Sequence, residues 1–435
     1  RVFTGHKANH IPGGTRLVIR TSAIPVQNPE LKRAHALHIP TKVYAEALGT
    51  LTREYKTLTI SGSHGKSTTT ALLSMVLTRA GFDPTVVIGT KLKEFRNSNF
   101  RNGKSNYLVL EADEHNAAFL HYSPTCAIIT NIDREHLDFY KNINNEKKTF
   151  LTFISNIKRG GILVVNKDDT NLFSLKVKIQ KIAKEKNIQV LWYGIRVDPR
   201  LYRRVSSSLQ IPGAHNASNA LAAYTLARAL GVKDQTIIKA LKQYKGAWRR
   251  MEYKGQLRIK NLEFRIKVYD DYAHHPTEIR ATLAGIAQKW PKSRVICVFE
   301  PHQAKRLALL FKAFTEAFWA ADALVLLPIY KVSGRDKVTH NISSEKLAKA
   351  IQAKLNSKFP PDFAWTKSKR AGRILNSKLT SVTYLPSPKK DLKKKIIEVI
   401  QSLPRKSALS LRESAIIVMM GAGDIYRLTD SLIES

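Results

Sequence analysis

The sequence lacks the features that mark membrane, secreted and disulfide-rich proteins. Among its 435 residues no apolar run approaches the roughly 20 residues that a membrane span needs, and the N-terminal RVFTGHKANH lacks the apolar stretch of a signal peptide. Only two cysteines are present, Cys126 and Cys297, each within an apolar strand-like run. This favours buried free thiols in a reducing cytoplasm over a disulfide. The length predicts two or three globular domains.

Acidic residues are scarce relative to basic ones. Asp and Glu number 34 against 72 Lys and Arg, which gives a formal net charge of +38. Such an excess is compatible with nucleic-acid binding, so that class of function stays open. However, the basic residues are spread along the chain in short runs such as Lys393–Lys395, and no recognisable nucleic-acid module is present. A lysine-rich solvated surface is therefore the favoured interpretation.

The most informative stretch is SGSHGKSTTTALLSMVL, from Ser61 to Leu77. A short buried strand is predicted before it, at 56–60, and an amphipathic helix after it that ends near Gly81. A strand, a glycine turn and a helix N-terminus form an anion site, because backbone N–H groups and the helix dipole point at one place. The loop departs from the general GxxxxGK[ST] pattern, since Ile60 stands at the first glycine position. A GKS triplet alone is often unrelated to phosphate, but this setting favours an ATP site.

Alternating strand and helix patterns divide the chain into three segments. Residues 1–53 are too short to close a sheet and are interpreted as the back half of a Rossmann-type domain, so the chain is expected to begin inside a domain. Residues 54–247 alternate apolar strands with helices, which predicts a mostly parallel sheet covered on both faces. Residues 248–435 restart the pattern with a hairpin and predict a second, smaller α/β domain, including a helix at 303–320.

Several polar residues are predicted to lie at the ends of these strands, where ligands of parallel sheets gather. Glu111 and His136 each follow an apolar strand next to the phosphate loop and could ligate Mg²⁺. By position alone, a capping or surface carboxylate is an equally good interpretation for Glu111. A solvated loop histidine is the better one for His136.

Three further motifs carry polar side chains at strand or helix ends. In HNASNALAA, Asn216 and Asn219 share a helix face and could meet an adenine, although plain N-terminal capping is favoured without context. In YDDYAHHPTEI, substrate and ribose contacts are favoured over a zinc site. In FEPHQAKR, His302 and Arg306 are placed to receive a carboxylate. The turn GAGD, from Gly421, is equally explained as a tight strand-to-helix connection.

Together these stretches resemble the Mur ligase family, from about residue 1 to the C-terminus. SGSHGKSTTT looks like the family's G-T-x-G-K-T-T-T loop, and LEADEHNAAFLHYSPTCAIITNIDREHLDFY like its acidic and histidine segments. HNASNALAA, RRMEYKG, DDYAHHPTEI, EPH and GAGDIYRL follow in the expected order. The resemblance implies a three-domain α/β architecture. A partial Rossmann-like domain at 1–53 would bind a UDP-sugar, a P-loop-type ATPase domain would span 54–247, and a Rossmann-like domain at 248–435 would contact the amino acid and ATP.

The resemblance also implies roles for individual residues. Those expected at ATP are Gly62, Ser63, His64, Gly65, Lys66, Ser67, Thr68, Asn216, Asn219, Arg250 and Asp271. Those expected to ligate Mg²⁺ are Ser67 or Thr68, Glu111 and His136. His275, His302 and Arg306 would lie near the amino acid and the acyl phosphate, with Lys66, Glu111, His136 and His275 taking part in catalysis.

The implied reaction is ATP-dependent amide formation between UDP-N-acetylmuramate and L-alanine, in the cytoplasm at the entry to peptidoglycan synthesis. Gln303 departs from the family, which usually has Arg after Pro-His, and puts one carboxylate contact in doubt. The family's N-terminal glycine-rich turn is absent from this chain. A ligase that attaches a whole peptide to the same sugar nucleotide, and a basic nucleic-acid-associated ATPase, remain as alternatives. A monomer or weak dimer without membrane contact is expected.

Overall fold

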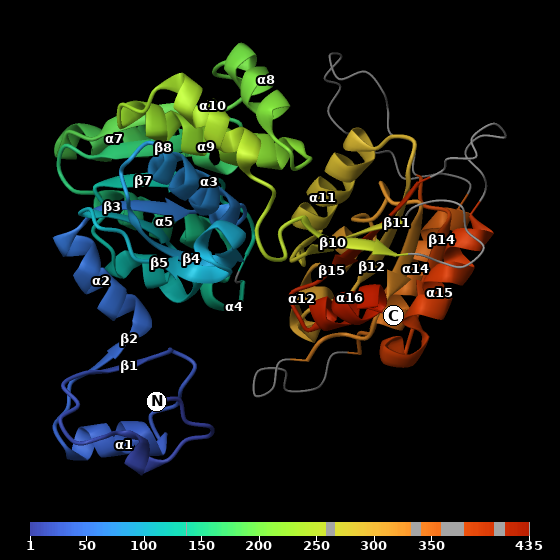
Figure 1. The fold of residues 1–435 in the computed structure, drawn as a ribbon, viewed down its shortest axis with the longest axis horizontal. Coiled ribbons are helices and arrows are strands. Elements are labelled where there is room, and N and C mark those ends of the chain that lie inside the picture. The colour runs from blue at the N-terminus through green and yellow to red at the C-terminus, as the bar shows by residue number, and fades with distance from the viewer. Residues whose placement is uncertain (136, 258–265, 332–340, 358–377, 404–413, 435) are drawn as a thin grey trace. The chain divides into compact units, whose positions relative to one another are not determined.

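The computed structural model describes residues 1–135, 137–257, 266–331, 341–357, 378–403 and 414–434. The chain divides into two compact units, Arg1–Ser208 with Ala217–Gln243 and Leu209–Asn216 with Tyr244–Ser435 (Figure 1). Both are layered arrangements of helices on a mostly parallel sheet, so the predicted α/β class is confirmed. Within the described ranges, no helix is long and apolar enough to cross a membrane.

The first unit is built on a seven-stranded sheet. In spatial order its strands are β5 (Ser98–Arg101), β4 (Thr85–Leu92), β6 (Tyr107–Glu111), β3 (Lys56–Ser61), β7 (Cys126–Ile129), β8 (Ile162–Asn166) and β9 (Gln189–Tyr193). All neighbours are parallel except β5, which pairs antiparallel with β4 at one edge. The sequence patterns predict the central strands but not β4 and β5. The end of β4 is polar and β5 is short, so neither has the apolar run of a central strand.

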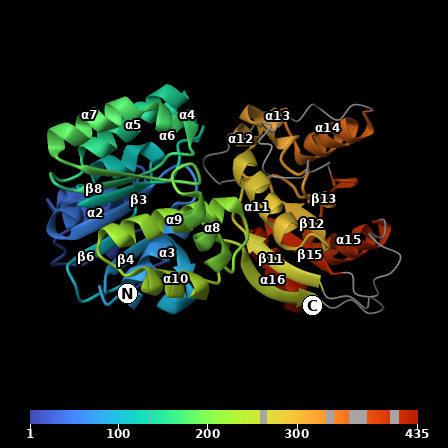
Figure 2. The ribbon, with the colours of Figure 1, turned by 90° about the horizontal axis from the view of Figure 1, so that it is seen from above.

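Helices cover both faces of this sheet, which is why its central strands are apolar on both sides (Figure 2). One face carries α3 (Lys66–Arg79), α9 (Ala214–Ala229) and α10 (Asp234–Gln243), and the other carries α5 (Ile143–Ser155), α6 (Thr170–Ser174) and α7 (Lys176–Lys186). On the second face, Leu108 and Leu110 of β6 belong to one core with Phe150 and Phe153 of α5. After β9 the chain forms α8 (Pro199–Ser208).

Helix α3 differs from the amphipathic helix expected after the phosphate loop. Ten of its 14 residues are buried, including Thr69, Thr70 and Ser74, because the sheet lies on one side and α10 packs on another. The hydroxyls of Thr70 and Ser74 donate to the helix's own backbone, to the carbonyls of Lys66 and Thr70, whereas that of Thr69 has no hydrogen-bond partner among the described residues. The helix gives way to Gly81, as predicted, at a positive φ of 83°.

The N-terminal residues form a separate two-stranded sheet with two helices. Strand β1 (Val18–Arg20) pairs parallel with β2 (Thr41–Val43), and helices α1 (Pro29–Ala36) and α2 (Tyr44–Glu54) follow them. Asn28 caps α1 by accepting from the backbone N–H groups of Glu30 and Leu31. The sequence pattern predicts a strand at 16–20 and helices at 28–38 and 44–53. Both helices are found, the first ending at Ala36, and the strand begins only at Val18.

The second unit has a six-stranded sheet. In spatial order its strands are β10 (Glu252–Leu257), β11 (Ile266–Asp271), β15 (Ala415–Met420), β12 (Arg294–Phe299), β13 (Ala323–Leu326) and β14 (Ser381–Tyr384). Only β10 is antiparallel to its neighbour, as the predicted hairpin requires, although residues 258–265 lie outside the described part of the chain. Free, buried thiols are confirmed for Cys297 in β12 and Cys126 in β7.

Side chains of β12 alternate between two cores in this unit. Val295, Cys297 and Phe299 belong to the core that also contains side chains of α11 (Pro276–Lys289), α12 (Ala304–Leu309), α13 (Phe311–Phe314) and α14 (Ser344–Asn356). Ile296 and Val298 belong to the core shared with α15 (Pro388–Ser402) and α16 (Ile425–Glu434). The sheet is therefore covered on both faces, as the apolar strands predicted.

One predicted helix of this unit is wrong in extent. Residues 303–320 form the two short helices α12 and α13 instead of one, because Leu310 leaves helical geometry with φ −110° and ψ 18°. The chain then turns so that Ala317 and Phe318 enter the core before β13. Helix α15 is not predicted from the sequence, because Pro386 and Pro388 at its start suggest a loop. Residues 358–377, within the segment 356–390 that the sequence pattern does not assign, lie outside the described residues.

Candidate functional site

The loop between β3 and α3 requires glycine at two positions. Gly62 has φ 134°, and a Cβ there would lie 2.1 Å from the hydroxyl oxygen of Thr130. Gly65, the residue before α3, has φ 82°, and its Cβ would lie 2.3 Å from the side-chain oxygen of Asn219. Both the backbone conformation and the close approach exclude a side chain, so the two glycines fix the path of the loop.

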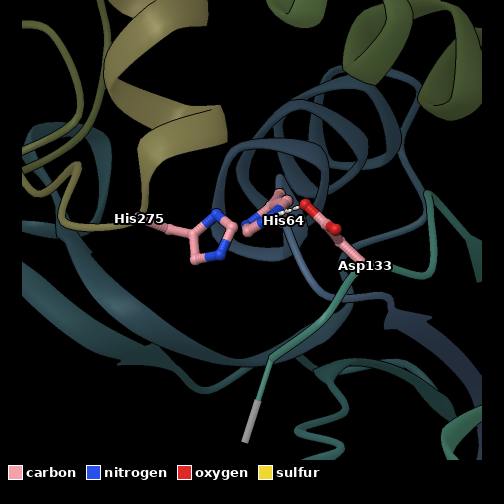
Figure 3. A group of neighbouring side chains, drawn as sticks. All are labelled: His64, Asp133 and His275. Atoms are coloured by element: carbon pink, nitrogen blue, oxygen red, sulfur yellow. Dashed lines mark hydrogen bonds and ion pairs between the residues drawn. The ribbon is translucent and has the colours of Figure 1, made fainter. Parts of the chain in front are cut away.

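The segment after β7 holds the outer side of this loop. The backbone N–H of His64 donates to Asn131 Oδ1 at 2.8 Å, and Asn131 Nδ2 donates back to the His64 carbonyl at 2.9 Å. The Ser63 N–H donates to the Asn131 carbonyl at 3.1 Å. Figure 3 shows the His64 ring beside Asp133, with Nε2 3.0 Å from Oδ2. The third residue drawn there, His275, belongs to the second unit. The loop follows β3, and the residues that hold it follow β7, the parallel neighbour of β3.

Lys66 lies in a buried ion pair at the start of α3. Its Nζ is 2.8 Å from Glu114 Oε2 and donates to the carbonyls of Gly62 and Ser63 at 2.7 and 3.2 Å. The Glu114 side chain is completely buried and that of Lys66 is 15% exposed. Burial disfavours the ammonium ion, but Glu114, Asp113 and Glu111 outweigh this effect and raise the pKa of Lys66. Burial raises the pKa of Glu114 to about 7, against the attraction of Lys66. The lysine is therefore held as a cation within the loop.

Two side-chain oxygens that could ligate a metal ion, from Ser67 and Glu111, lie close together near the carboxyl ends of β3 and β6. Ser67 Oγ donates to Glu111 Oε1 at 2.8 Å, and the Gly89 N–H donates to Glu111 Oε2 at 2.7 Å. Strands β3 and β6 are parallel neighbours, so the predicted approach of Glu111 to the loop is found. A hydroxyl and a carboxylate are hard oxygen donors of the kind that Mg²⁺ prefers. Thr68 is buried one residue further along α3, and His136 lies outside the described residues.

The remaining groups around the loop also suit an anion. Helix α3 has no acidic residue in its first turn, so its own side chains do not neutralise the positive end of its dipole. Asn219 of α9 lies against Gly65 and is buried. Asn216, three residues earlier, is also buried and donates from Nδ2 to the Pro212 carbonyl at 2.6 Å. One of the two asparagines thus borders the loop, while the other already holds the start of α9.

In the second unit, two adjacent arginines differ in their surroundings. Arg249 is 3% exposed; its Nε donates to Asp270 Oδ1 at 3.1 Å and its guanidinium also donates to the carbonyls of Gly421 and Gly423. Arg250 is half-buried and lies over the Tyr272 ring, 4.8 Å from its centroid. Arg249 is therefore occupied in holding the GAGD turn, which leaves Arg250 as the arginine that can reach a ligand.

The carboxylate of Asp271 is already engaged at the end of β11. Its two oxygens accept from the Met251 and Ala273 N–H groups at 2.8 and 2.9 Å. Burial raises its pKa to about 6, against the attraction of Arg250. Each oxygen keeps one further lone pair for a ligand hydroxyl. The arrangement fits a structural role and leaves room for the predicted ribose contact.

His275 begins α11 through a capping box. Its Nδ1 accepts from the Thr277 N–H at 3.3 Å, while the Glu278 carboxylate accepts from the His275 N–H at 3.3 Å. The ring of His274 lies 3.3 Å from the same carboxylate. The sequence HHPTEIRATLAGIAQKW predicts a helix with Pro276 in its first turn, which α11 confirms, and His275 is fixed at its start by backbone contacts.

His302, Gln303 and Arg306 lie around the start of α12. The His302 ring is stacked on Tyr330 with centroids 5.5 Å apart, and the Gln303 N–H donates to the Tyr330 carbonyl at 3.2 Å. Gln303 has a positive φ of 67°, unusual for a residue with a side chain, and Arg306 is half-buried in the helix. These residues are therefore held next to one another at one helix start.

Sequence reasoning missed two residues that the site depends on. Glu114 and Asn131 both lie within the acidic and histidine segments quoted above. Neither receives a role there, although the pattern places Asn131, like Glu111, at a strand end where ligands gather. A signal for Glu114 exists, because an acidic residue three positions after Glu111 follows the same strand. Nothing in the sequence indicates that the Asn131 amide bonds the loop from both sides.

Family models and relatives match the chain along most of its length. The models are described as "Mur ligase family, catalytic domain" at residues 1–56, "Mur ligase middle domain" at 60–227 and "Mur ligase, glutamate ligase domain" at 249–372. A UDP-N-acetylmuramate–L-alanine ligase of Desulfosudis oleivorans is 34% identical over the whole of this chain and 88% of its own length. One of Desulforapulum autotrophicum is 39% identical over 81% of this chain and 78% of its own length.

Solved structures agree with this match at the level of the fold. The UDP-N-acetylmuramate-alanine ligase of Thermotoga maritima has a TM-score of 0.69 and 23% identity, covering 99% of this chain and 87% of its own. A murein peptide ligase from Psychrobacter arcticus has a TM-score of 0.57 and 20% identity, covering 96% and 85%. With three family models along the chain and full-length relatives above 30% identity, the chain belongs to the Mur ligase family.

Proposed function

We propose that this protein joins L-alanine to the lactyl carboxylate of UDP-N-acetylmuramate in an ATP-dependent reaction. The observation that carries the proposal is the loop of the first unit, in which Lys66 and the Ser67–Glu111 pair surround a helix N-terminus. Relatives that are 34–39% identical bear the name of this activity. The reaction belongs to peptidoglycan precursor synthesis, which takes place in the cytoplasm.

The residues of the loop fit the phosphates of ATP. Backbone N–H groups at the start of α3 and the ammonium of Lys66 would bind the phosphate oxygens and offset the charge that develops during phosphoryl transfer. For this, Lys66 exchanges its contacts with the Gly62 and Ser63 carbonyls for the phosphates, while Glu114 keeps its ammonium charged. Asn219, which already touches Gly65, is proposed to meet the adenine with Asn216.

The oxygen pair of Ser67 and Glu111 fits Mg²⁺. The Gly89 N–H holds the Glu111 carboxylate from the far side and thereby keeps its Oε1 directed at Ser67. Thr68 and His136 remain proposed additional ligands. When bound, the ion supplies positive charge at the phosphates being transferred.

In the second unit we assign substrate contacts to residues held at strand ends. Arg250 would bind ATP phosphate and Asp271 a ribose hydroxyl, while His275, His302 and Arg306 would bind the amino acid and the activated carboxyl group. In the reaction a lactyl carboxylate oxygen attacks the γ-phosphorus of ATP, ADP leaves and an acyl phosphate forms. The neutral amine of alanine then attacks the acyl carbon, and a proton and inorganic phosphate leave as the amide forms. Positive and N–H groups lower the barrier because both steps build negative charge on oxygen.

The experiment that tests this function is phosphate release from ATP with UDP-N-acetylmuramate and a panel of acceptors. We expect release with L-alanine, less with serine and glycine, and none with D-glutamate. A chain that releases phosphate only with a whole peptide would be the alternative peptide ligase of the same family. No release with any acceptor, from protein with a cooperative unfolding transition, would refute the proposal.

Recognition of alanine is expected to depend on its carboxylate, because its single methyl offers only about 1 kcal/mol of burial. Arg306→Ala should therefore raise the KM for alanine strongly, whereas Lys305→Ala, an exposed neighbour, should leave it unchanged. Gln303→Arg should lower it, because charge-assisted hydrogen bonds are roughly twice as strong as neutral ones. An unchanged KM in Arg306→Ala would mean that the carboxylate is bound elsewhere.

A further inference from the structure

A buried carboxyl group lies directly behind the phosphate loop. Glu146, on α5, has an exposed fraction of 0%. Its Oε1 accepts from the hydroxyl of Ser63 at 3.2 Å, and that hydroxyl in turn accepts from the Asp133 N–H at 2.8 Å. Its Oε2 is buried and has no hydrogen-bond partner among the described residues. None of the roles proposed above uses this group.

The surroundings of Glu146 oppose a negative charge. Burial is the largest effect, and the carboxylates of Glu114, after β6, and of Glu135 and Asp133, after β7, act in the same direction. Tyr140 of α4 (Leu137–Tyr140) also faces this cluster, with its hydroxyl bonded to the Glu114 carbonyl. The Ser63 hydroxyl favours the ionised form but does not compensate, and the pKa of Glu146 is raised to about 8. At pH 7 these surroundings therefore favour the neutral form of Glu146.

Ser63 connects this acid to the catalytic lysine. Its side chain contacts Glu146, while its carbonyl accepts from Lys66 Nζ at 3.2 Å. The preceding carbonyl, of Gly62, accepts from the same ammonium at 2.7 Å. A displacement of Ser63 would therefore move the carbonyls that seat Lys66. Ionisation of Glu146 would also place a full negative charge behind the loop that is to receive phosphates.

We propose that Glu146 is a positioning residue of the phosphate loop, which in its neutral form fixes Ser63 and thereby Lys66, and so sets the affinity for ATP. The inference rests on the proposed function, because it takes ATP as the ligand of the loop. Glu146, on α5, would thus influence ATP affinity through Ser63 and Lys66 without touching the nucleotide. Its consequence is that ATP binds more weakly as the pH rises through the range in which Glu146 loses its proton.

The test is ATP affinity, measured by calorimetry with Mg²⁺ and without the other substrates, between pH 7 and pH 9. In the parent protein we expect the affinity to fall severalfold across this range. Glu146→Gln, which keeps the shape and the Ser63 contact without a titratable group, should bind like the parent at pH 7 and lose little affinity at pH 9. Glu146→Ala should bind ATP severalfold more weakly at every pH, because it loses the contact with Ser63. Of the two variants, only Glu146→Gln should show the parent's ATP affinity at pH 7.

A matched control is Asp169→Asn. Asp169 caps α6 and its pKa is also raised by burial, to about 6, but its carboxylate contacts the backbone N–H groups of Leu172 and Ile132 and not the loop. This variant should keep the parent's pH profile of ATP affinity. If Glu146→Gln also keeps the parent's alkaline fall, another group causes it and the inference is wrong. If the parent binds no ATP at pH 7, the proposed function itself is wrong.

A second readout does not require ATP. A group whose pKa is raised on folding contributes stability that is fully present below its unfolded pKa, here 4.5, and is lost as the pH rises through about 8. The free energy of unfolding of the parent should therefore decline relative to that of Glu146→Gln between these values. For Asp169→Asn the corresponding decline ends near pH 6. A parent-minus-variant difference for Glu146→Gln that is flat between pH 6.5 and 8 would contradict a neutral Glu146.

Discussion

At the scale of single residues, the phosphate loop depends on the buried pair of Lys66 and Glu114. Their charged atoms are 2.8 Å apart, and the carboxylate is completely buried. Removing one partner of such a pair leaves an uncompensated buried charge and costs about 3–5 kcal/mol, whereas replacing both can be nearly neutral. Variants of Lys66 must therefore be interpreted together with Glu114.

We expect Lys66→Met to abolish ATP-dependent ligation and also to lower the free energy of unfolding. Adding Glu114→Gln to it should restore much of the stability, because the orphaned carboxylate is gone, but should not restore activity. Phosphate release and urea unfolding of both variants measure the two effects separately. Ligation at the parent's rate in the double variant would remove Lys66 from the reaction.

Arg249 and Arg250 offer a second comparison between neighbouring residues. Arg249 is paired with the buried Asp270 and bonded to two carbonyls of the GAGD turn, so Arg249→Met should destabilise the second unit by several kcal/mol. Arg250→Met should change the free energy of unfolding by less than about 1 kcal/mol and raise the KM for ATP. Thermal unfolding and ATP titrations of the two variants check this. Equal destabilisation would mean that both arginines are structural.

At the scale of elements, the residue before α3 has a left-handed backbone conformation and lies in close contact with a side chain of α9. Gly65 has a positive φ and lies against Asn219. Gly81, at the other end of the helix, has a similar φ of 83°, but a Cβ there would have no atom within 4 Å. An alanine at Gly81 would therefore suffer backbone strain alone, whereas an alanine at Gly65 would suffer both strain and a steric clash. Strain alone costs an alanine in the left-handed region roughly 1–2 kcal/mol.

Gly81→Ala should consequently lower the free energy of unfolding by about that amount and leave ATP binding unchanged. Gly65→Ala should cost more, because Asn219 must also move, and it should weaken ATP binding by displacing the loop. Urea unfolding and nucleotide titration of the two variants provide the measurement. If Gly65→Ala behaves like Gly81→Ala in both assays, the contact with Asn219 has no part in the site.

At the scale of the whole molecule, the net charge of +38 sets the behaviour in salt. Like charges spread over the surface repel one another and destabilise the compact state. Ion pairs between described residues are mostly at the surface, where each contributes little. The charge is therefore expected to reduce stability at low ionic strength.

We expect the free energy of unfolding to rise between about 0.05 and 0.5 M NaCl, because salt shortens the Debye length and screens the repulsion between exposed charges. Urea unfolding followed by tryptophan fluorescence measures this, with KCl as a control for specific ion effects. A stability that is flat or falls with salt would contradict net self-repulsion. Tight DNA binding lost steeply with salt would instead favour a nucleic-acid function.

The sequence by itself determined the elements whose patterns are local. Apolar strands at β3, β6 and β7, the glycine loop before α3 and the Pro276 helix start were all predictable, because burial on both faces and helix capping leave direct marks on neighbouring residues. The order of motifs also indicated the family. The sequence placed Glu111 after a strand expected to lie next to the loop, and the parallel pairing of β3 with β6 then brings it to Ser67.

Only the tertiary structure decided which distant residues meet at the loop. The pairing of Lys66 with Glu114, the bracing by Asn131 and the contact of Glu146 with Ser63 join segments 48, 67 and 83 residues apart. The edge strand β5, the break between α12 and α13 and the different surroundings of Arg249 and Arg250 likewise follow from packing. Periodicity and capping report only on near neighbours along the chain. Burial, which sets the charge of Glu146, depends on everything that packs around it.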